Sequence, residues 1–487
     1  MEKIYISYFP RIIIILGLLI LLSFFHLKGI IPYDEGWVLH PAVRFLQGDV
    51  PYKDFHFIYT PGSIFIAAFF LKILGESILA ARIGAILISF TTVIVCYKIG
   101  KLTTNSTLLA ILPPLMFILW GPTHITFLWP TMLAVTGGII TVFFLLTALK
   151  KKSKKYFFLA GILTSVTVIL KQNLGLALIF NVICFFLFIK EARQQYNFLW
   201  YFSGLLLIFL IFLTYLLNSH SFFPFLQDFY FFMIEQTILK GMQSTPFLPA
   251  DIIPKVIIKL YFYLIPLVIS LIALIVAVKK KSRFFILATF PIFYYLLGIR
   301  PTTDYVHLTP LLSLIGFPFA LLMAKVKSTG KRSIIAVNFI LVLVLAVYSI
   351  LFKGFYRWQD PILKHSYFLE NPRSRVFTDS KSYYIITKIT EFIQNHTLTK
   401  DPIFVYTYSP LFYFLTDRKN PTKFEYLPPN LLSENDQKEI IQNLEDNKVH
   451  LIVTDAPIIY QNTLIANFIK NNFNPSYQID ISTIWTR

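Results

Sequence analysis

Two adjacent carboxylates, Asp34 and Glu35, follow the first long apolar run of the sequence in the stretch YDEGW. Acidic residues are scarce here, with 25 among 487 residues, so a pair of them at the end of an apolar run needs a reason. Asp34 can cap the helix predicted from EGWVLHPAVRFL, which is worth about 1 kcal/mol. The same carboxylate can also serve in catalysis, and the sequence leaves both interpretations open.

Further charged and polar side chains lie in short segments between apolar runs. Each has a structural explanation: Lys171 can extend to lipid headgroups, Arg300 and Asp304 can form a simple ion pair, and histidines can satisfy turns. However, a charge at the bilayer centre costs about 2.5–3.5 kcal/mol on insertion scales, and such charges usually mark function. Together, these residues therefore indicate a functional site more strongly than any one of them does alone. Its candidates are Arg82, His124, Lys171, Asn173, Arg300, Asp304 and His307.

The composition predicts a membrane protein with many spans. Hydrophobic residues make up 56% of the chain and charged residues 14%, far from the averages of soluble domains. The net charge of +19 does not indicate nucleic-acid binding, because the lysines form short clusters between apolar runs, which is typical of membrane topology. Cys96 and Cys184 lie inside such runs, so we expect no disulfide.

About 11 apolar runs are long enough to cross, or nearly cross, a bilayer. The first is interpreted as a retained span, because no small-residue cleavage site follows it. Basic clusters separate alternate runs, and the positive-inside rule places them, with the N-terminus, in the cytoplasm. The clusters lie at 98–101, 150–155, 190–193, 279–283 and 325–332. The runs lie near 11–27, 78–97, 106–120, 131–149, 156–170, 174–189, 198–217, 256–278, 284–299, 306–324 and 333–352.

The candidate residues then belong to the opposite, outer side. Its first segment, residues 28–77, contains an apolar helix at 61–74 that is too short for a comfortable span. Counting that helix as a span would place the basic cluster at 150–155 outside. We therefore expect the helix to lie in the outer interface of the membrane. The other outer segments are 121–130, 171–173, 218–255 and 300–307.

The chain changes character after residue 352. Long apolar runs stop, and residues 353–487 show strand patterns at 401–407 and 450–456 with a helix at 433–449 that Ser433 can cap. Alternating strands and helices predict a small extracytoplasmic α/β domain. Residues 1–352 then form an all-helical membrane domain of about 11 transmembrane helices plus juxtamembrane helices.

The first outer segment contains an ordered series of short motifs. An acidic pair follows the first span, then come L-x-G, P-Y-x-D, a tyrosine and proline that open a short apolar helix, G-x-S, and an arginine that begins the next span. The series resembles the lipid-dependent glycosyltransferases of the GT-C fold, specifically the protein O-mannosyltransferase and aminoarabinose transferase branch. LKQN and RPTTDYVH also resemble bacterial members. The matching residues are Asp34-Glu35, Leu46-Gly48, Pro51-Tyr52-Asp54, Tyr59-Pro61, Gly75-Ser77 and Arg82.

The resemblance implies transfer of a hexosyl or pentosyl group from a polyprenyl-phosphate donor to an acceptor hydroxyl on the outer face, with inversion. Asp34 would be the base or would orient the acceptor. Glu35 could support it, although neighbouring helix residues point about 100° apart. Arg82, with Lys171 or Arg300, would bind the donor phosphate.

Tyr59, His124, Asn173, Asp304 and His307 would contact substrate. No metal or other cofactor is expected, because no carboxylate cluster suggests one. One departure from the aminoarabinose branch concerns phosphate binding. That branch has a basic residue before the proline of its short helix, whereas this chain has Thr60, so phosphate contact would come from elsewhere or the acceptor differs.

Two other classes of function remain open from the sequence. A transporter or flippase of lipid-linked sugars would share a basic, aromatic outer cavity, although such proteins often have repeated halves, and we find no repeat. A scaffold or receptor working through residues 353–487 would leave the acidic pair without a task. Within the glycosyltransferase interpretation, the sugar is open, and the acceptor can be a protein, a glycolipid or a cell-envelope polymer. The expected location is the plasma membrane.

Overall fold

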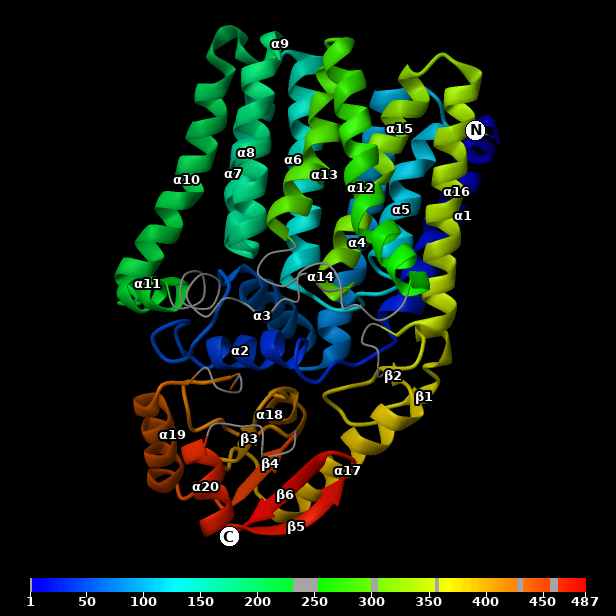
Figure 1. The fold of residues 1–487 in the computed structure, drawn as a ribbon. Helices are drawn as coiled ribbons and strands as arrows, with labels where there is room; N and C mark the ends of the chain where they lie inside the picture. Colours follow the sequence, from blue (N-terminus) through cyan, green and yellow to red (C-terminus); the bar gives the residue numbers. More distant parts are fainter. Residues whose placement is uncertain are drawn as a thin grey trace.

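The computed structural model describes residues 2–230, 253–298, 305–354, 359–425, 427, 432–455 and 463–487. Three layers follow one another from top to bottom in Figure 1: a bundle of apolar helices, a thin layer that contains α2 and α3, and an α/β region. We call residues 359–487 the C-terminal region. The thin layer therefore separates the bundle from the C-terminal region, and it contains the acidic pair.

The bundle accounts for the apolar runs of the sequence. Five helical segments are long and apolar enough to cross a membrane: Ile78–Thr104, Pro130–Lys151, Lys190–Asn218, His307–Lys325 and Thr329–Phe352. Several other apolar helices are shorter, as their runs indicated. The bundle helices are α1 (Glu2–His26), α4 (Ile78–Thr104), α5 (Leu112–Trp120), α6 (Pro130–Lys151), α7 (Lys154–Leu170), α8 (Gln172–Phe188), α10 (Asn197–Asn218), α12 (Ile253–Lys279), α13 (Ile286–Gly298), α14 (Tyr305–Leu312), α15 (Gly316–Lys325) and α16 (Thr329–Phe352).

One expected span is interrupted. The run at 306–324 forms two helices, α14 and α15, separated by a turn at 313–315. Pro318 explains the break, because a proline cannot donate to the carbonyl four residues earlier and its ring collides with that carbonyl. The carbonyl of Leu314 accepts instead from Phe317 N–H at 3.1 Å.

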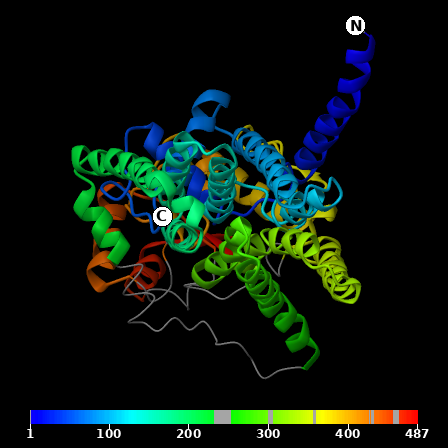
Figure 2. The same cartoon turned by 90° about the horizontal axis from the view of Figure 1, so that it is seen from above.

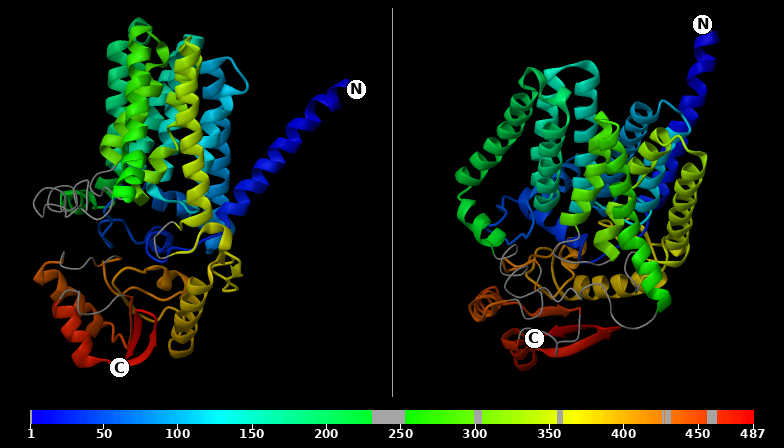
Figure 3. Two further views of the ribbon diagram at one scale, coloured as in Figure 1. Left: turned by 45° about the vertical axis from the view of Figure 1, so that its right-hand side comes forward. Right: turned by 45° about the horizontal axis from the view of Figure 1, so that its top comes forward.

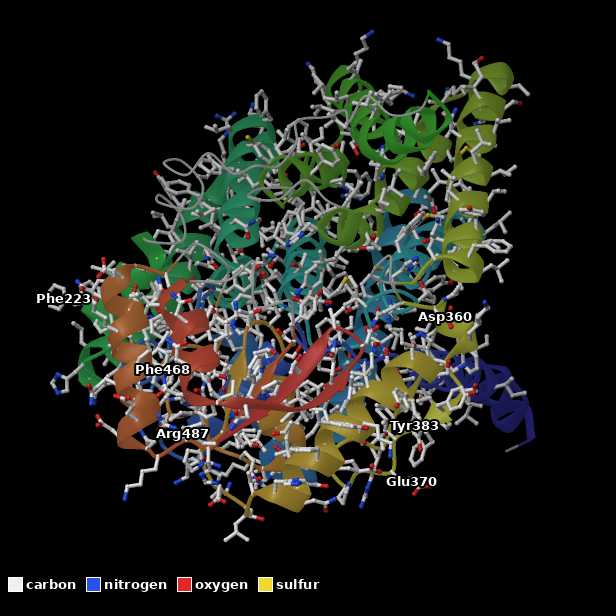
Figure 4. The ribbon with its side chains drawn as sticks, turned by 60° about the horizontal axis from the view of Figure 1, so that its bottom comes forward. Phe223, Asp360, Glu370, Tyr383, Phe468 and Arg487 are labelled. Carbon is white, nitrogen blue, oxygen red and sulfur yellow. The ribbon has the colours of Figure 1, made fainter. Side chains whose placement is uncertain are left out.

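The ends of the bundle differ in their connections. The short helix α9 (Lys190–Arg193) lies at the end away from the C-terminal region, whereas α11 (Phe222–Tyr230) lies at the near end (Figure 1). Seen from above, α1 leans away from the other helices (Figure 2), and the tilted views show the same separation (Figure 3). Phe223 projects from α11 at the edge of the molecule (Figure 4) and is exposed. The acidic pair thus lies at the end opposite α9.

The thin layer consists mainly of α2 (Gly36–Leu46) and α3 (Gly62–Leu74). The expected helix at 61–74 is present as α3. The expected cap is wrong, because Glu35 and not Asp34 occupies the N-cap position, and no side chain caps the helix. Glu35 has helical dihedral angles and its N–H donates to Ile31 C=O at 3.1 Å. The turn before α2 therefore continues into the helix.

The C-terminal region has a four-stranded sheet in the order β3-β4-β6-β5. β3 and β4 are parallel, and β6 is antiparallel to both β4 and β5. The expected strands and helix are present, and Ser433 caps α19 in a capping box with Asp436. The elements are β1 (Tyr367–Phe368), β2 (Phe377–Thr378), α17 (Ser380–His396), β3 (Phe404–Tyr406), α18 (Leu411–Thr416), α19 (Glu434–Asp446), β4 (Leu451–Thr454), α20 (Thr463–Asn472), β5 (Asn474–Ile479) and β6 (Ser482–Thr486).

Alternation along β3 and β4 gives this sheet two buried faces. Phe404 and Ile452 belong to a core with residues of α19 and α20, whereas Val405 and Val453 belong to a core with residues of α17 and α18. Successive strand residues point to opposite faces, so helices cover both sides. Leu411 of α18 also joins the large core of the bundle and thin layer. The helix α18 therefore connects the C-terminal region to the layer that contains Asp34.

Candidate active site

Asp34 lies in the turn that leads into α2 and is partly buried. Trp37 N–H donates to Tyr33 C=O at 2.8 Å, so this turn is helical and Asp34 lies one turn before Trp37. Residues three apart on a helix share a side. The Trp37 ring lies 5.5 Å from the Phe57 ring and 5.3 Å from the Tyr59 ring, centroid to centroid. Asp34 therefore shares its side of the helix with Trp37 and its aromatic neighbours.

The C-terminal region contacts the turn that carries Asp34. Leu411 N–H donates to Pro32 C=O at 3.2 Å, and the rings of Tyr33 and Tyr408 are 6.2 Å apart. A Cβ atom at Gly36 would lie 2.2 Å from the backbone nitrogen of Leu411. Only glycine permits so close an approach of two backbones. The first turn of α2 is thus packed directly against α18.

Glu35 is turned away from solvent and bound to Arg82. Its Oε2 accepts from the Arg82 guanidinium at 2.8 Å, and both side chains are 1% exposed or less. Arg82 also donates to Gly29 C=O at 2.7 Å and to the Thr126 hydroxyl. Burial raises the pKa of Glu35, and the charge of Arg82 opposes that shift. This pair ties the first outer segment to α4, and it places neither group at an accessible surface.

Two buried atoms of this pair have no hydrogen-bond partner within the described part of the chain. They are Glu35 Oε1 and Arg82 Nε. Leaving a buried polar atom unpaired costs about 1–3 kcal/mol. The structure therefore assigns Arg82 first to Glu35, and its predicted contact with a donor phosphate would require the pair to rearrange.

Lys171 is a buried cation surrounded by aromatic rings. It is 2% exposed, and its Nζ donates to the Thr131 hydroxyl at 2.6 Å. The same Nζ lies 4.7 Å from the centre of the Tyr59 ring and 5.5 Å from that of Trp129. Cation–π contacts of this kind are worth about 2 kcal/mol or more when desolvated. We call this group, with Trp37 and His307, the Lys171 cluster.

The Lys171 cluster brings together three residues that the sequence proposed separately. His307, at the start of α14, has its ring 5.6 Å from that of Trp129, so Tyr59, Lys171 and His307 surround one place. The sequence did not select Trp37, Trp129 or Thr131. The available signal was the occurrence of aromatic residues at the outer ends of the apolar runs. Aromatic residues are so common in this chain that this signal did not separate site residues from other aromatic residues.

The residues after Lys171 fix the surrounding backbone. Lys171 itself is extended and α8 begins at Gln172, so the expected turn at 171–173 is one residue long. The Gln172 side chain accepts from Thr60 N–H at 3.2 Å and donates to Ile58 C=O at 3.0 Å. Asn173 donates to Leu297 C=O at 3.0 Å. These bonds join the segment before α3 to the outer ends of α8 and α13, and they give Asn173 a structural contact.

His124 lies elsewhere. Its ring hydrogen-bonds with the hydroxyls of Thr123 at 2.9 Å and Ser349 at 2.8 Å, and it stacks on Trp120. Burial lowers the pKa of His124 to about 4. The structure thus places this neutral histidine against α16 and not in the Lys171 cluster. Arg300 and Asp304, the two other predicted site residues, lie outside the described residues.

A second buried charge cluster lies farther along α2. Glu425 accepts from the guanidinium of Arg44 at 2.8 Å and hydrogen-bonds with His40 at 2.6 Å, and its side chain is fully buried. Burial alone would raise the pKa of Glu425, but His40 and Arg44 outweigh it and hold the pKa near 2. More than 370 residues separate the partners in sequence, so no local pattern could have revealed this cluster.

Among the described residues, no group of three His, Cys, Asp or Glu side chains is arranged to bind a metal ion. The expectation of a metal-free reaction stays a prediction. The chemistry available at this edge of the bundle is that of the Asp34 carboxylate, the Lys171 ammonium and the aromatic rings around it.

Comparison with known proteins supports the resemblance. Residues 59–217 match a family model described as dolichyl-phosphate-mannose-protein mannosyltransferase. No curated protein sequence matches the chain significantly.

Solved structures extend the comparison over the whole chain. The crystal structure of ArnT from Cupriavidus metallidurans bound to undecaprenyl phosphate is similar with a TM-score of 0.61 and 10% identity, over 98% of both chains. The apo structure of the same protein gives 0.59 and 11% over the same coverage. Arabinosyltransferase EmbB from Mycobacterium smegmatis is also matched, at 0.44 and 14%, over 77% of this chain and 36% of EmbB.

The ArnT structures confirm the fold expected from the motifs. The similarity to ArnT covers bundle, thin layer and C-terminal region alike, and the family match contains Tyr59, Arg82 and Lys171. A transporter is not favoured by either comparison. The chain therefore has the fold of ArnT, and residues 59–217 match the mannosyltransferase family model.

Proposed function

We propose that the protein transfers a sugar from a polyprenyl-phosphate donor to an acceptor hydroxyl at the outer face of the plasma membrane. The observation that carries this proposal is that Asp34, in the turn before α2, and the Lys171 cluster, which includes Trp37 of α2, lie at one end of an apolar bundle. A lipid-linked donor would lie in the bilayer with its phosphosugar at this end. The presence of undecaprenyl phosphate in the ArnT crystal structure supports a donor of this class.

In the proposed mechanism, the acceptor hydroxyl attacks the anomeric carbon and the polyprenyl phosphate leaves from the opposite face, which gives inversion. Asp34 accepts the hydroxyl proton, and a positioned base of this kind contributes about 10²–10⁴-fold. Lys171 stabilises the charge that develops on the departing phosphate. Tyr59 and Trp129 keep that cation desolvated, which strengthens its interaction with phosphate. Glu35 and Arg82 hold the base in position.

The proposed topology places the N-terminus in the cytoplasm and the C-terminal region outside. The basic segment α9 lies at the end of the bundle away from the C-terminal region (Figure 1), which supports this orientation under the positive-inside rule. We propose about 11 crossings, with α3 in the outer interface, and two domains, 1–352 and 353–487. The acceptor is proposed to be a cell-envelope glycan, lipid or protein.

Asp34→Asn tests the proposal. Purified protein in liposomes would be supplied with a panel of radiolabelled polyprenyl-phosphate sugars and a membrane extract as the source of acceptor. We expect the variant to lose about 10²–10⁴-fold in rate while donor binding stays near wild type. Asp360→Asn, which changes an exposed carboxylate, is the matched control and should transfer normally. Full activity of Asp34→Asn would remove Asp34 from catalysis, and movement of sugar-lipid across the bilayer without transfer would favour a transporter.

A further inference from the structure

The hairpin of β1 and β2 in the C-terminal region has two aromatic side chains on its exposed face. Phe368 and Phe377 pair across the two strands with their ring centroids 5.1 Å apart, and they are 42% and 37% exposed. Their neighbours in the chain, Leu369 and Val376, are buried in the large core, as the alternation of side chains along a strand predicts. The hairpin therefore packs through one face and exposes a pair of phenylalanine rings on the other.

This exposed face continues the exposed apolar surface of α1. Phe377 is bridged to Lys28. The N–H of Phe377 donates to Leu27 C=O at 2.9 Å, and its C=O accepts from Gly29 N–H at 2.8 Å. The Lys28 ammonium in turn lies 4.1 Å from the centre of the Phe24 ring of α1, which is 46% exposed. We call the resulting series from helix to hairpin the aromatic row: Phe24, Lys28, Phe377 and Phe368.

The aromatic row lies at the depth of the lipid headgroups. Apolar side chains of α1 are exposed as far as Phe24, and the helix ends at His26. Lys28 comes four residues after Phe24, which at 1.5 Å per residue is about 6 Å farther along the helix axis. The headgroup layer on each side of a bilayer is about 5–8 Å thick. Figures 1 and 3 show the hairpin beside the ends of α1 and α16, so its exposed rings share this depth.

We infer that the aromatic row binds the lipid bilayer on the side of the C-terminal region. The rings of Phe368 and Phe377 enter the boundary between headgroups and acyl chains, where interfacial segments bury their apolar side chains. The Lys28 ammonium meets a lipid phosphate, which its long stem allows it to reach. A lipid surface fits the row better than a second protein does, because the row begins on a helix face that the bilayer already covers.

The other charges of the hairpin permit this contact. Arg373 is paired with Glu76 and Asp417. The exposed side chains of Arg375 and Glu370 have opposite charges and balance each other. The contact holds the C-terminal region beside α1, in addition to its packing against the thin layer. It depends on the bundle crossing a membrane and not on sugar transfer, so a failure of the proposed catalysis would leave this inference intact.

A depth measurement in liposomes tests this inference. The full-length protein with Cys96→Ala and Cys184→Ala would carry a fluorophore on Phe368→Cys, in liposomes of phosphatidylcholine that has a nitroxide near its headgroup. We expect this lipid to quench the label about as strongly as it quenches one on Phe24→Cys. Leu398→Cys is the matched negative control, because Leu398 is an exposed apolar residue that follows α17, which leads away from the bundle (Figure 1). Quenching of the Phe368→Cys label no stronger than that of the Leu398→Cys label would overturn the inference.

A second substitution tests whether the two rings of the hairpin act together. Phe377→Ser in the labelled Phe368→Cys protein should lower the quenching about twofold, because it removes the neighbouring apolar ring from the interface. Ile481→Ser replaces an exposed apolar residue elsewhere in the C-terminal region and should leave the quenching unchanged. Equal quenching with and without Phe377→Ser would remove the aromatic row as the membrane contact.

Discussion

Two stretches along α2 contain charge in opposite ways. At the start of α2, Asp34 precedes Trp37, whose neighbour Tyr59 lies against the buried cation Lys171. Lys171 also lies over the Trp129 ring and donates to the Thr131 hydroxyl. Farther along α2, His40 and Arg44 belong to a network of ion pairs that borders a cavity toward the C-terminal region. The Lys171 cluster is suited to act on a desolvated phosphate, whereas the paired charges of His40, Arg44 and Glu425 join α2 to the C-terminal region.

Two buried glutamates show the same contrast in energetic terms. Among the described residues, Glu35 has one cationic partner and an unpaired oxygen, and burial raises its pKa. Glu425 has two partners that engage both oxygens, and its pKa falls to about 2. Burial acts on both carboxylates, so the number of partners decides the direction.

Glu425→Gln should have the largest effect on stability. It removes the carboxylate between Arg44 and His40 and leaves a buried cation short of a partner, which costs about 3–5 kcal/mol. Thermal unfolding in detergent measures the loss. Glu439→Gln breaks the exposed pair with Lys423 and should change the free energy of unfolding by less than about 0.5 kcal/mol. Similar midpoints for the two variants would show that the interface between α2 and the C-terminal region does not depend on this network.

Lys171→Met should lower sugar transfer by about 10²–10³-fold, the usual loss when a charge-stabilising donor is removed. Methionine keeps the length of the side chain and its contacts with Tyr59 and Trp129. Lys98→Met is a suitable control, since Lys98 also lies over an aromatic ring, that of Phe143 at 5.9 Å. Lys171→Arg should recover part of the activity. A Lys171→Met protein that transfers at the wild-type rate would assign phosphate binding to another cation.

Acid should destabilise the protein through His124 well before it affects Glu425. The pKa of His124 is about 4 in the folded protein against 6.5 unfolded, so stability present above pH 6.5 is lost as pH falls toward 4. At pH 5 the loss is about 2 kcal/mol. The loss from Glu425, with a pKa of about 2 against 4.5 unfolded, comes only between pH 4.5 and 2.

The difference between the pH profiles of wild type and His124→Gln isolates this contribution. Burial also lowers the pKa of His365, which remains in both proteins and therefore cancels. Unfolding midpoints measured between pH 7.5 and 5 should fall less steeply for His124→Gln. Parallel profiles would mean that His124 gains no protection from burial.

Thr131→Val should have the smallest effect. It removes the hydroxyl that accepts from Lys171, a bond worth about 1 kcal/mol, and should weaken donor binding or transfer about fivefold. Thr91→Val removes a hydroxyl that bonds within α4 on an exposed surface and should have no effect on transfer. A loss as large as that of Lys171→Met would show that Thr131 itself contacts substrate.

The motifs of the first outer segment indicated the correct fold because they report local requirements. Ser77 of the G-x-S motif is an example: it is the N-cap residue of α4, and its hydroxyl accepts from Ala80 N–H at 3.2 Å. In contrast, the assignment of Asp34 as a helix cap failed, because the cap depends on backbone angles at Glu35. Local composition does not fix those angles when the preceding turn is already helical.

The sequence by itself determined the apolar helices, the end of the bundle at which the polar residues gather, and the α/β character of the C-terminal region. These features follow from hydrophobic periodicity and charge distribution, which are properties of neighbouring residues. Only the tertiary structure decided that Arg82 binds Glu35, that Lys171 lies between Tyr59 and Trp129, and that Arg418 borders a cavity under α2. Burial and pairing join residues far apart in the chain, and a charge takes its role from the partners that folding places beside it.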